Sequence, residues 1–307
     1  MKQAHKNILL IFITLFAFLS CDTPENTGSD QPFIVATTGM VADLVKNIAG
    51  DSVYVESLMG PGVDPHLYKA SQSDIGKLAE ADIIFYNGLH LEGKLTDIFE
   101  KMARTQNVIP VSRGITQSAL IPLAENGTLN DPHIWFDVSL WKQTIGVVET
   151  ELAETYPNKA EYFRSRAQAY RDSLTIMHKW VGEKIQEIPK TQRILITAHD
   201  AFSYFGRAYG INVRGLQGIS TVAEYGVNDV SRMVNLIIDN NIKAIFIETS
   251  VPDRSINAVI AGCKAKGHDV KIGGSLYSDA MGAPGTREGT YIGMIKSNVL
   301  TMVTNLK

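Results

Sequence analysis

The sequence predicts an α/β protein built from two (β/α)-type lobes with parallel sheets, joined by one long rigid helix. Two observations lead to this prediction. Short runs rich in β-branched and aromatic residues alternate with helical stretches in both halves of the chain, a pattern typical of parallel sheets with helical crossovers. Between the halves lies a long stretch whose apolar residues recur at helical spacing.

The first half supplies strand and helix candidates in alternation. Strands are expected at residues 33–37, 53–58, 83–86 and 108–111. The last of these is weakened by Pro110, which has no backbone donor for a sheet. A helix at residues 41–49 should end at Gly50, and a second helix should begin at Ser73-Asp74.

Residues 158–188 predict one continuous helix, because proline is absent from the stretch and flanks it at Pro157 and Pro189. At 1.5 Å per residue such a helix is roughly 45 Å long. We interpret it as a strut packed along both lobes; a coiled-coil arm is the alternative. Its apolar residues recur in steps of three and four and form one seam: Phe163, Ala167, Tyr170, Leu174, Met177, Val181, Ile185 and Ile188.

The second half repeats the α/β pattern. Short buried strands are expected at residues 194–197, 244–247 and 270–272, and helices at 233–238 and 256–266. Gly267 follows the second helix as a stop signal.

The N-terminus has the features of a signal peptide at residues 1–20. Lysines are followed by an apolar run that is short for a membrane span, and Cys21 comes directly after it. The cysteine resembles that of a bacterial lipobox, where it carries a lipid anchor; ordinary secretion with an unmodified Cys21 is the alternative. Residues 22–32 are polar and predict a flexible tether. The expected lobes are residues 33–157 and 190–307, linked by a helix at 158–189.

Composition excludes several classes of protein. The net charge is −3, so there is no basic field for nucleic acid, and beyond the leader the sequence has no second apolar stretch of membrane-spanning length. Cys263 is the only cysteine besides Cys21, so no disulfide framework is expected.

Three histidines and one aspartate form the candidate site. Asp64-Pro65-His66 and Asp131-Pro132-His133 repeat one tripeptide in two expected loops, His199 follows an expected strand, and Asp279 follows another. Three imidazoles and a carboxylate form a typical ligand set for a first-row divalent metal. The four residues come from both halves of the chain, so we expect the metal site in the cleft between the lobes.

Each candidate also has an alternative interpretation. A single loop histidine is usually only hydrogen-bonded or exposed, His199-Asp200 could be a catalytic pair, and Asp279 could cap a helix. Other histidines lack a comparable setting, and we expect His178 to face solvent: His90, His178 and His268 are therefore left out of the site. Four carboxylates could orient the imidazoles from behind or be structural: Asp64, Asp131, Asp200 and Glu248.

These motifs resemble a known family. Gly60-Pro61-Gly62-Val63-Asp64-Pro65-His66-Leu67-Tyr68 is similar to the first ligand loop of bacterial metal-ion solute-binding lipoproteins, the extracytoplasmic receptors of zinc, manganese and iron ABC importers. The similarity runs from about residue 33 to the end. Further segments resemble the later signatures of the family: Asn87-Gly88-Leu89-His90-Leu91-Glu92, Asp131-Pro132-His133-Ile134-Trp135-Phe136-Asp137, Thr197-Ala198-His199-Asp200-Ala201-Phe202, Gly215-Leu216-Gln217-Gly218-Ile219-Ser220-Thr221 and Leu276-Tyr277-Ser278-Asp279-Ala280-Met281-Gly282.

The resemblance implies the same four ligands and a function. It implies a monomeric, membrane-anchored lipoprotein, periplasmic or on the cell surface, that binds Zn²⁺ or Mn²⁺, with Fe²⁺ also compatible, and delivers it to an ABC permease. The identity of the transported metal stays open, because the sequence departs from the family in two ways. Residues 112–130 hold no histidine, unlike the insertion of many zinc receptors. His199 stands where many manganese receptors have glutamate. A secreted metallohydrolase and a structural or cell-adhesion protein are the alternatives. We expect no enzyme, since four protein ligands close the site and no HExxH motif is present.

Overall fold

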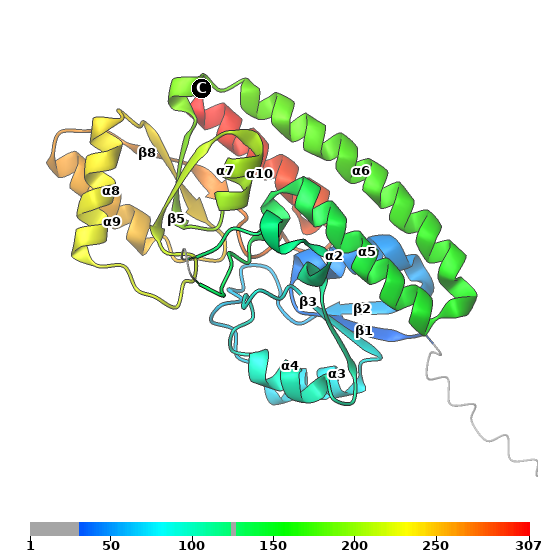
Figure 1. The fold of residues 1–307 in the computed structure, drawn as a ribbon. Helices are drawn as coiled ribbons and strands as arrows, with labels where there is room; N and C mark the ends of the chain where they lie inside the picture. Colours follow the sequence, from blue (N-terminus) through cyan, green and yellow to red (C-terminus); the bar gives the residue numbers. More distant parts are fainter. Residues whose placement is uncertain (1–30, 124–126) are drawn as a thin grey trace, which may run out of the picture. The chain divides into compact units, whose positions relative to one another are not determined.

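The first lobe is built on a four-stranded parallel sheet with the strand order β2-β1-β3-β4 (Figure 1). Its strands are β1 (Phe33–Ala36), β2 (Tyr54–Ser57), β3 (Ile83–Tyr86) and β4 (Asn107–Pro110). Its helices are α2 (Gly39–Ala49), α3 (Gln72–Glu80), α4 (Thr96–Met102) and α5 (Val138–Thr155). Pro110 is tolerated because β4 is an edge strand and needs no donor on its outer side.

Both faces of this sheet are covered, as a parallel sheet requires. Ile34 and Ala36 of β1 point into the main apolar core with α2, whereas Val35 between them points into a smaller cluster with α3 and α4. Alternation of side chains along a strand produces this division. The carboxyl ends of the strands are left free to carry loops.

The second lobe contains two parallel strand pairs, β5 with β6 and β7 with β8, and β5 packs beside β7. The strands are β5 (Ile194–His199), β6 (Asn212–Gln217), β7 (Ala244–Glu248) and β8 (Lys271–Leu276). The helices are α7 (Ser203–Tyr209), α8 (Val227–Asp239), α9 (Arg254–Ala265) and α10 (Tyr291–Leu306). Helices α8 and α9 cover one face with their own apolar cluster, while the other face joins the main core.

Helix α6 (Ala160–Gln186, 27 residues) runs along both lobes (Figure 1). It packs against α2 and α5 of the first lobe and against α7 and α10 of the second lobe. Every residue of the predicted seam is buried, which confirms the strut and excludes a free coiled-coil arm. Because the main apolar cluster is continuous through both lobes, Pro32–Lys307 form one compact unit.

Several details differ from the expectations. Helix α3 begins earlier than Ser73, because the Ser71 side chain caps it and the Asp74 carboxylate accepts a hydrogen bond from the backbone N–H of Ser71. His178 does not face solvent: it is half-buried, and its Nδ1 lies 3.0 Å from the Tyr209 hydroxyl of α7. Strand β8 is longer than expected, and the sequence did not predict β6, α4, α5, α7 and α10.

The computed structural model describes residues 31–123 and 127–307. The predicted signal peptide, Cys21 and nearly all of the tether lie outside these residues. Among the helices of the described part, none is both long and apolar enough to cross a membrane. The residue limits of the lobes given above stay a prediction.

Candidate metal centre

The two Asp-Pro-His tripeptides form the same local turn. Asp64 Oδ1 accepts the backbone N–H of His66 at 2.8 Å, and Asp131 Oδ1 accepts that of His133 at 2.9 Å. In both cases the carboxylate bonds the N–H two residues ahead, and the intervening proline restricts the backbone and offers no competing donor. The repeated tripeptide therefore fixes the backbone position from which each histidine side chain extends.

The other two residues lie at the carboxyl ends of strands in the second lobe. His199 is the last residue of β5, and its backbone N–H donates to Glu248 Oε1 at 2.8 Å, at the end of β7. Asp279 follows β8, and its backbone N–H donates to Ser250 Oγ at 3.4 Å. Ligands of open α/β sheets gather at such ends, because loops from neighbouring strands meet there.

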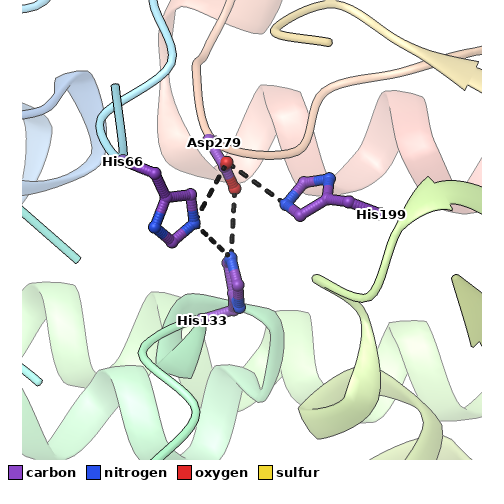
Figure 2. A group of neighbouring side chains, drawn as sticks. All are labelled: His66, His133, His199 and Asp279. Atoms are coloured by element: carbon purple, nitrogen blue, oxygen red, sulfur yellow. Dashed lines mark hydrogen bonds and ion pairs between the residues drawn. The ribbon is translucent and has the colours of Figure 1, made fainter. Parts of the chain in front are cut away.

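The structure brings the four predicted side chains together (Figure 2). His66 Nε2 lies 3.3 Å from His133 Nε2 and 3.7 Å from Asp279 Oδ2. His133 Nε2 lies 3.4 Å from Asp279 Oδ1, and His199 Nε2 lies 3.2 Å from Asp279 Oδ2. One ligand atom from each residue can be chosen so that all four lie within 4.8 Å of one another. Metal–ligand bonds of about 2.0–2.1 Å in a tetrahedron separate the ligand atoms by roughly 3.4 Å, close to these distances.

The chemistry of this cluster fits a cation. All four residues are buried, and within the described part of the chain both carboxylate oxygens of Asp279 and Nε2 of His199 have no hydrogen-bond partner. Buried polar atoms without a partner are costly, so their convergence on one point indicates that a ligand completes them. The lone pairs of the imidazoles and the carboxylate favour the binding of a positive ion.

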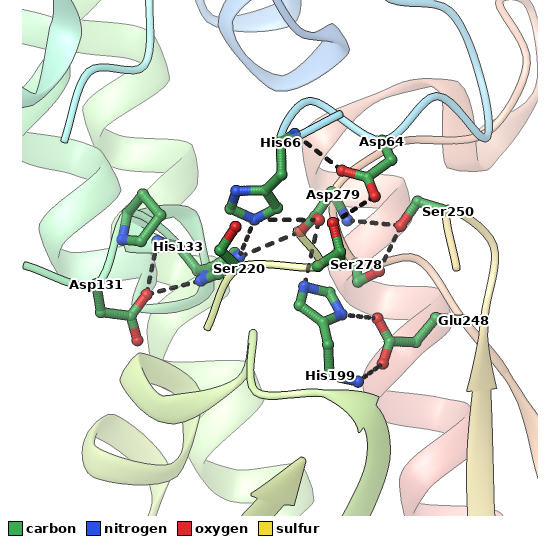
Figure 3. A network of polar contacts seen from close by, with 12 residues as sticks. Asp64, His66, Asp131, His133, His199, Ser220, Glu248, Ser250, Ser278 and Asp279 are labelled. Atoms are coloured by element: carbon green, nitrogen blue, oxygen red, sulfur yellow. Dashed lines mark hydrogen bonds and ion pairs between the residues drawn. The ribbon is translucent and has the colours of Figure 1, made fainter. Parts of the chain in front are cut away.

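Two imidazoles are oriented by carboxylates behind them (Figure 3). Asp131 Oδ1 lies 2.7 Å from Nδ1 of His133, and Glu248 Oε2 lies 2.5 Å from Nδ1 of His199. An Nδ1–H bonded in this way fixes the ring and leaves Nε2 free for a metal. Of the two roles that the sequence left open for Asp131 and Glu248, these contacts favour orienting the imidazoles.

The same carboxylates set the proton affinity of the site. Burial opposes charge on His133, but Asp131 and Asp279 outweigh it and raise its pKa to about 9. His199 behaves alike: burial is overcome by Glu248 and Asp279, and its pKa lies well above the ordinary value. Burial lowers the pKa of His66 to about 4. Burial also disfavours the charged form of Asp279, but His199 and His133 hold its pKa well below the usual range.

The remaining candidates do not reach the cluster. Asp64 bonds the backbone of His66 rather than its ring, and Asp200 accepts a hydrogen bond from Ser203 Oγ at 2.9 Å and bonds none of the described imidazoles. Among the described residues no helix begins directly after Asp279: the next long one, α10, starts at Tyr291 and is capped by Thr290, so Asp279 does not cap a helix. His90 lies in a turn with a positive φ of 63°, and His268 bonds the carbonyl oxygen of Ile242 at 2.7 Å.

Sequence reasoning missed the residues that join the ligand loops to one another. Thr221 donates to Asp64 Oδ2 at 2.6 Å. Ser250 Oγ lies 2.8 Å from Ser278 Oγ (Figure 3). Trp135 Nε1 donates to the carbonyl oxygen of Ser278 at 3.1 Å. These are common residue types whose role depends on distant partners. Thr221, Trp135 and Ser278 lie in segments that resemble family signatures, which offered a signal, whereas Ser250 lies outside them.

A parallel α/β scaffold with a buried cluster of metal-ligating atoms between its two lobes is the architecture of a solute receptor for metal ions. A family model described as "Zinc-uptake complex component A periplasmic" matches residues 34–305, and the chain belongs to this family of solute-binding components of metal ABC transporters. The resemblance on which the sequence expectations rested is thereby confirmed.

Individual relatives agree with this assignment. The chain is 46% identical to the manganese-binding lipoprotein MntA of Bacillus subtilis over 299 residues, which cover 97% of each protein. It is 46% identical to the zinc-binding protein TroA of Treponema pallidum over 282 residues, 92% of this chain and 91% of TroA. A structure of TroA superimposes with a TM-score of 0.87 over 90% of this chain and 99% of TroA. The Fe(III)-bound YtgA of Chlamydia trachomatis is 25% identical, with a TM-score of 0.81 over 90% of this chain and 98% of YtgA.

Proposed function

We propose that this chain is an extracytoplasmic receptor that binds a divalent metal ion with high affinity and delivers it to the permease of an ABC importer. The ion is held by His66, His133, His199 and Asp279. The single observation that carries the proposal is the convergence of their buried ligand atoms, several of which have no other partner. The metal is cargo, so the site must bind it tightly and still release it.

The donor set supports zinc and manganese as the cargo, with iron also compatible. Asp279 turns Oδ1 toward His133 and Oδ2 toward His66 and His199, so the carboxylate can bind through one oxygen or through both. Four donors suit tetrahedral Zn²⁺, and a second carboxylate oxygen raises the coordination number toward that of Mn²⁺. MntA, TroA and YtgA are named for manganese, zinc and Fe(III), and the relatives therefore leave the same choice open.

We infer transport rather than catalysis or adhesion. A catalytic zinc site usually keeps three protein ligands and an open position for water, whereas four protein donors fill this one. We also propose that the protein acts as a monomer and is anchored by a lipid at Cys21, as expected of a lipoprotein outside the cytoplasm. Adhesion has no observation in its favour among the described residues.

Metal analysis of the protein purified from its own host, followed by competition between Zn²⁺ and Mn²⁺ for the metal-free form, tests the proposal. We expect one equivalent of metal per chain and transfer to membranes that contain the importer. Protein that binds neither ion above background would contradict the receptor function. Hydrolysis of simple esters or phosphates by the loaded protein would instead support an enzyme.

A further inference from the structure

The second ligand loop is tied firmly to the second lobe. The Tyr204 hydroxyl of α7 donates to the carbonyl oxygen of Asp131 at 2.8 Å, and the Tyr291 hydroxyl of α10 donates to that of Trp135 at 2.7 Å. Trp135 itself donates to the carbonyl oxygen of Ser278. All these groups are buried. Displacing His133 would leave several buried polar groups unpaired, each at a cost of about 1–3 kcal/mol.

His199 and Asp279 are equally constrained. Glu248 bonds both the backbone N–H and Nδ1 of His199, so the imidazole cannot swing without breaking a buried carboxylate pair. Asp279 is linked through its backbone to Ser250, which also contacts Ser278. Movement of His199 or Asp279 would have to break these contacts.

The first ligand loop, residues 60–68, is anchored differently. Its residues Gly60, Pro61, Gly62 and Leu67 are exposed, and Gly62 has a positive φ of 72°. His66 has no carboxylate behind its ring among the described residues, in contrast to His133 and His199. Apart from contacts within the ligand cluster, the one hydrogen bond recorded from this loop to the described part of the second lobe joins Asp64 Oδ2 to Thr221 Oγ1.

Thr221 lies in the segment of residues 218–226 that joins β6 to α8. This segment starts beside the site, because Gln217 pairs with His199 and Gly218 accepts the backbone N–H of Asp200 at 3.4 Å. Thr221 is 9% exposed, whereas the next residue, Val222, is 53% exposed. The Thr221 hydroxyl therefore lies at the end of the site nearest the surface, where a loop of the first lobe contacts a loop of the second lobe.

We propose that Thr221 is a positioning residue that closes the metal site by holding the first ligand loop against the second lobe. The proposal rests on the proposed function and deepens it. Thr221 holds one oxygen of Asp64, and the other oxygen of Asp64 holds the backbone of His66. When the Thr221–Asp64 bond breaks, His66 can leave with its loop, and the metal enters or departs through the gap that opens.

The strength of this contact is suited to a reversible closure. A hydroxyl-to-carboxylate distance of 2.6 Å is that of a short, charge-assisted hydrogen bond. It is a single bond near the surface, so it can open without disturbing the core. The other three ligands stay in place, and the site is ready to rebind.

Two substitutions separate the effect of the Thr221 hydroxyl from that of the rest of its side chain. Thr221→Val keeps the shape of the side chain and removes the donor, whereas Thr221→Ser keeps the donor. Thr249→Val is the matched control, because Thr249 directly follows Glu248 and its Oγ1 is buried with no hydrogen-bond partner among the described residues. Release of Zn²⁺ from the full loaded protein into a chromogenic chelator is followed by stopped flow, with the melting temperature of each metal-free variant as the check on folding.

We expect Thr221→Val to release Zn²⁺ about 10-fold faster, equivalent to about 1.4 kcal/mol, while Thr221→Ser and Thr249→Val release it at the parent rate. Should the valine variant fold poorly, Thr221→Ala provides the same comparison. A parent-like rate in Thr221→Val overturns the inference, as does equal acceleration in Thr249→Val. A parent protein that binds no Zn²⁺ or Mn²⁺ rejects the proposed function itself, an outcome distinct from both.

Discussion

One oxygen of Asp131 bonds His133 twice. Asp131 Oδ1 accepts the backbone N–H of His133 at 2.9 Å and lies 2.7 Å from Nδ1 of its ring, so a single carboxylate fixes both the backbone and the imidazole. Asp64, in the same position of the first tripeptide, fixes only the backbone of His66 and gives its second oxygen to Thr221. The repeated tripeptide thus produces one rigid ligand and one adjustable ligand.

Asp131→Asn should weaken metal binding about 10- to 100-fold, because a neutral amide is a poorer acceptor for the imidazole N–H. The control is Asp200→Asn, since Asp200 bonds Ser203 and no imidazole. Isothermal titration with a competing chelator measures both affinities. Equal losses of metal affinity in the two variants would mean that Asp131 contributes only its negative charge and does not act by orienting the His133 ring.

Removing a ligand should have a larger effect than removing its partner. His66→Ala, His133→Ala, His199→Ala and Asp279→Ala should each reduce affinity by more than about 100-fold, because each deletes one of four donors. His268→Gln should bind metal as the parent does, since the His268 ring bonds the carbonyl oxygen of Ile242 and is not a member of the ligand cluster. Unchanged affinity in His133→Ala would falsify the proposed ligand set.

Protons should compete with the metal up to alkaline pH. The pKa of His133 is raised to about 9 and that of His199 is also raised, so metal-free protein holds protons on these rings at neutral pH. Metal must displace them, and affinity should therefore rise as the pH increases toward about 9. Calorimetry at pH 7 in buffers of different ionisation enthalpy should detect proton release on binding. An affinity independent of pH between 6 and 9 would contradict this assignment.

The same shift makes the metal-free fold sensitive to pH. A raised pKa on His133 stabilises the folded state below the unfolded value of about 6.5, and this stabilisation is lost as the pH rises through about 9. The melting temperature of metal-free protein should consequently fall between pH 6.5 and 9. The loaded protein should lack this trend, since its imidazoles hold metal instead of protons.

The seam of α6 should be a major source of stability. Leu174→Ala removes a fully buried side chain and should lower the free energy of unfolding by about 2–5 kcal/mol. Ile176→Ala on the same helix should change it by less than about 0.5 kcal/mol, because Ile176 is 71% exposed. Urea denaturation compares the two, and metal affinity should be unchanged in both.

Because α6 packs on both lobes, metal binding should not close them by a large swing. Bending the helix would expose buried side chains at roughly 1.5–3 kcal/mol each. Solution scattering of metal-free and loaded protein should give the same radius of gyration. A decrease of the size expected for whole-lobe closure would refute the strut but leave the ligands untouched.

The sequence predicted the parts of the site whose chemistry is local. The repeated tripeptide, the histidine at the end of an apolar run and the long helical seam are visible without a structure. The strand expected at residues 270–272 continues in the structure through Gly273-Gly274 to Leu276. In the fold these glycines allow close approach: a Cβ on Gly273 would lie 3.0 Å from the Phe246 ring, and one on Gly274 2.6 Å from Thr301.

Elements that depend on distant packing were harder to predict. Helix α5 contains the β-branched residues Val138, Thr144, Ile145, Val147 and Val148, which are weak helix formers, and it is stabilised by packing against α6. Thr221 and His178 are ordinary polar residues until the fold supplies Asp64 and Tyr209 as partners. Local pattern cannot assign such pairs, because the partners are far away in the chain.

The spacing of the ligands along the chain has a consequence for folding. His66 and Asp279 are 213 positions apart (279 − 66), and Asp279 follows β8, the last strand of the described chain. The cage therefore exists only after the chain has nearly completed its topology, and an unfolded chain offers no comparable site. Metal cannot nucleate this fold. It stabilises the finished one by mass action, by about 4.1 kcal/mol when its concentration is 1,000 times Kd, so cargo in the medium also protects the receptor from unfolding.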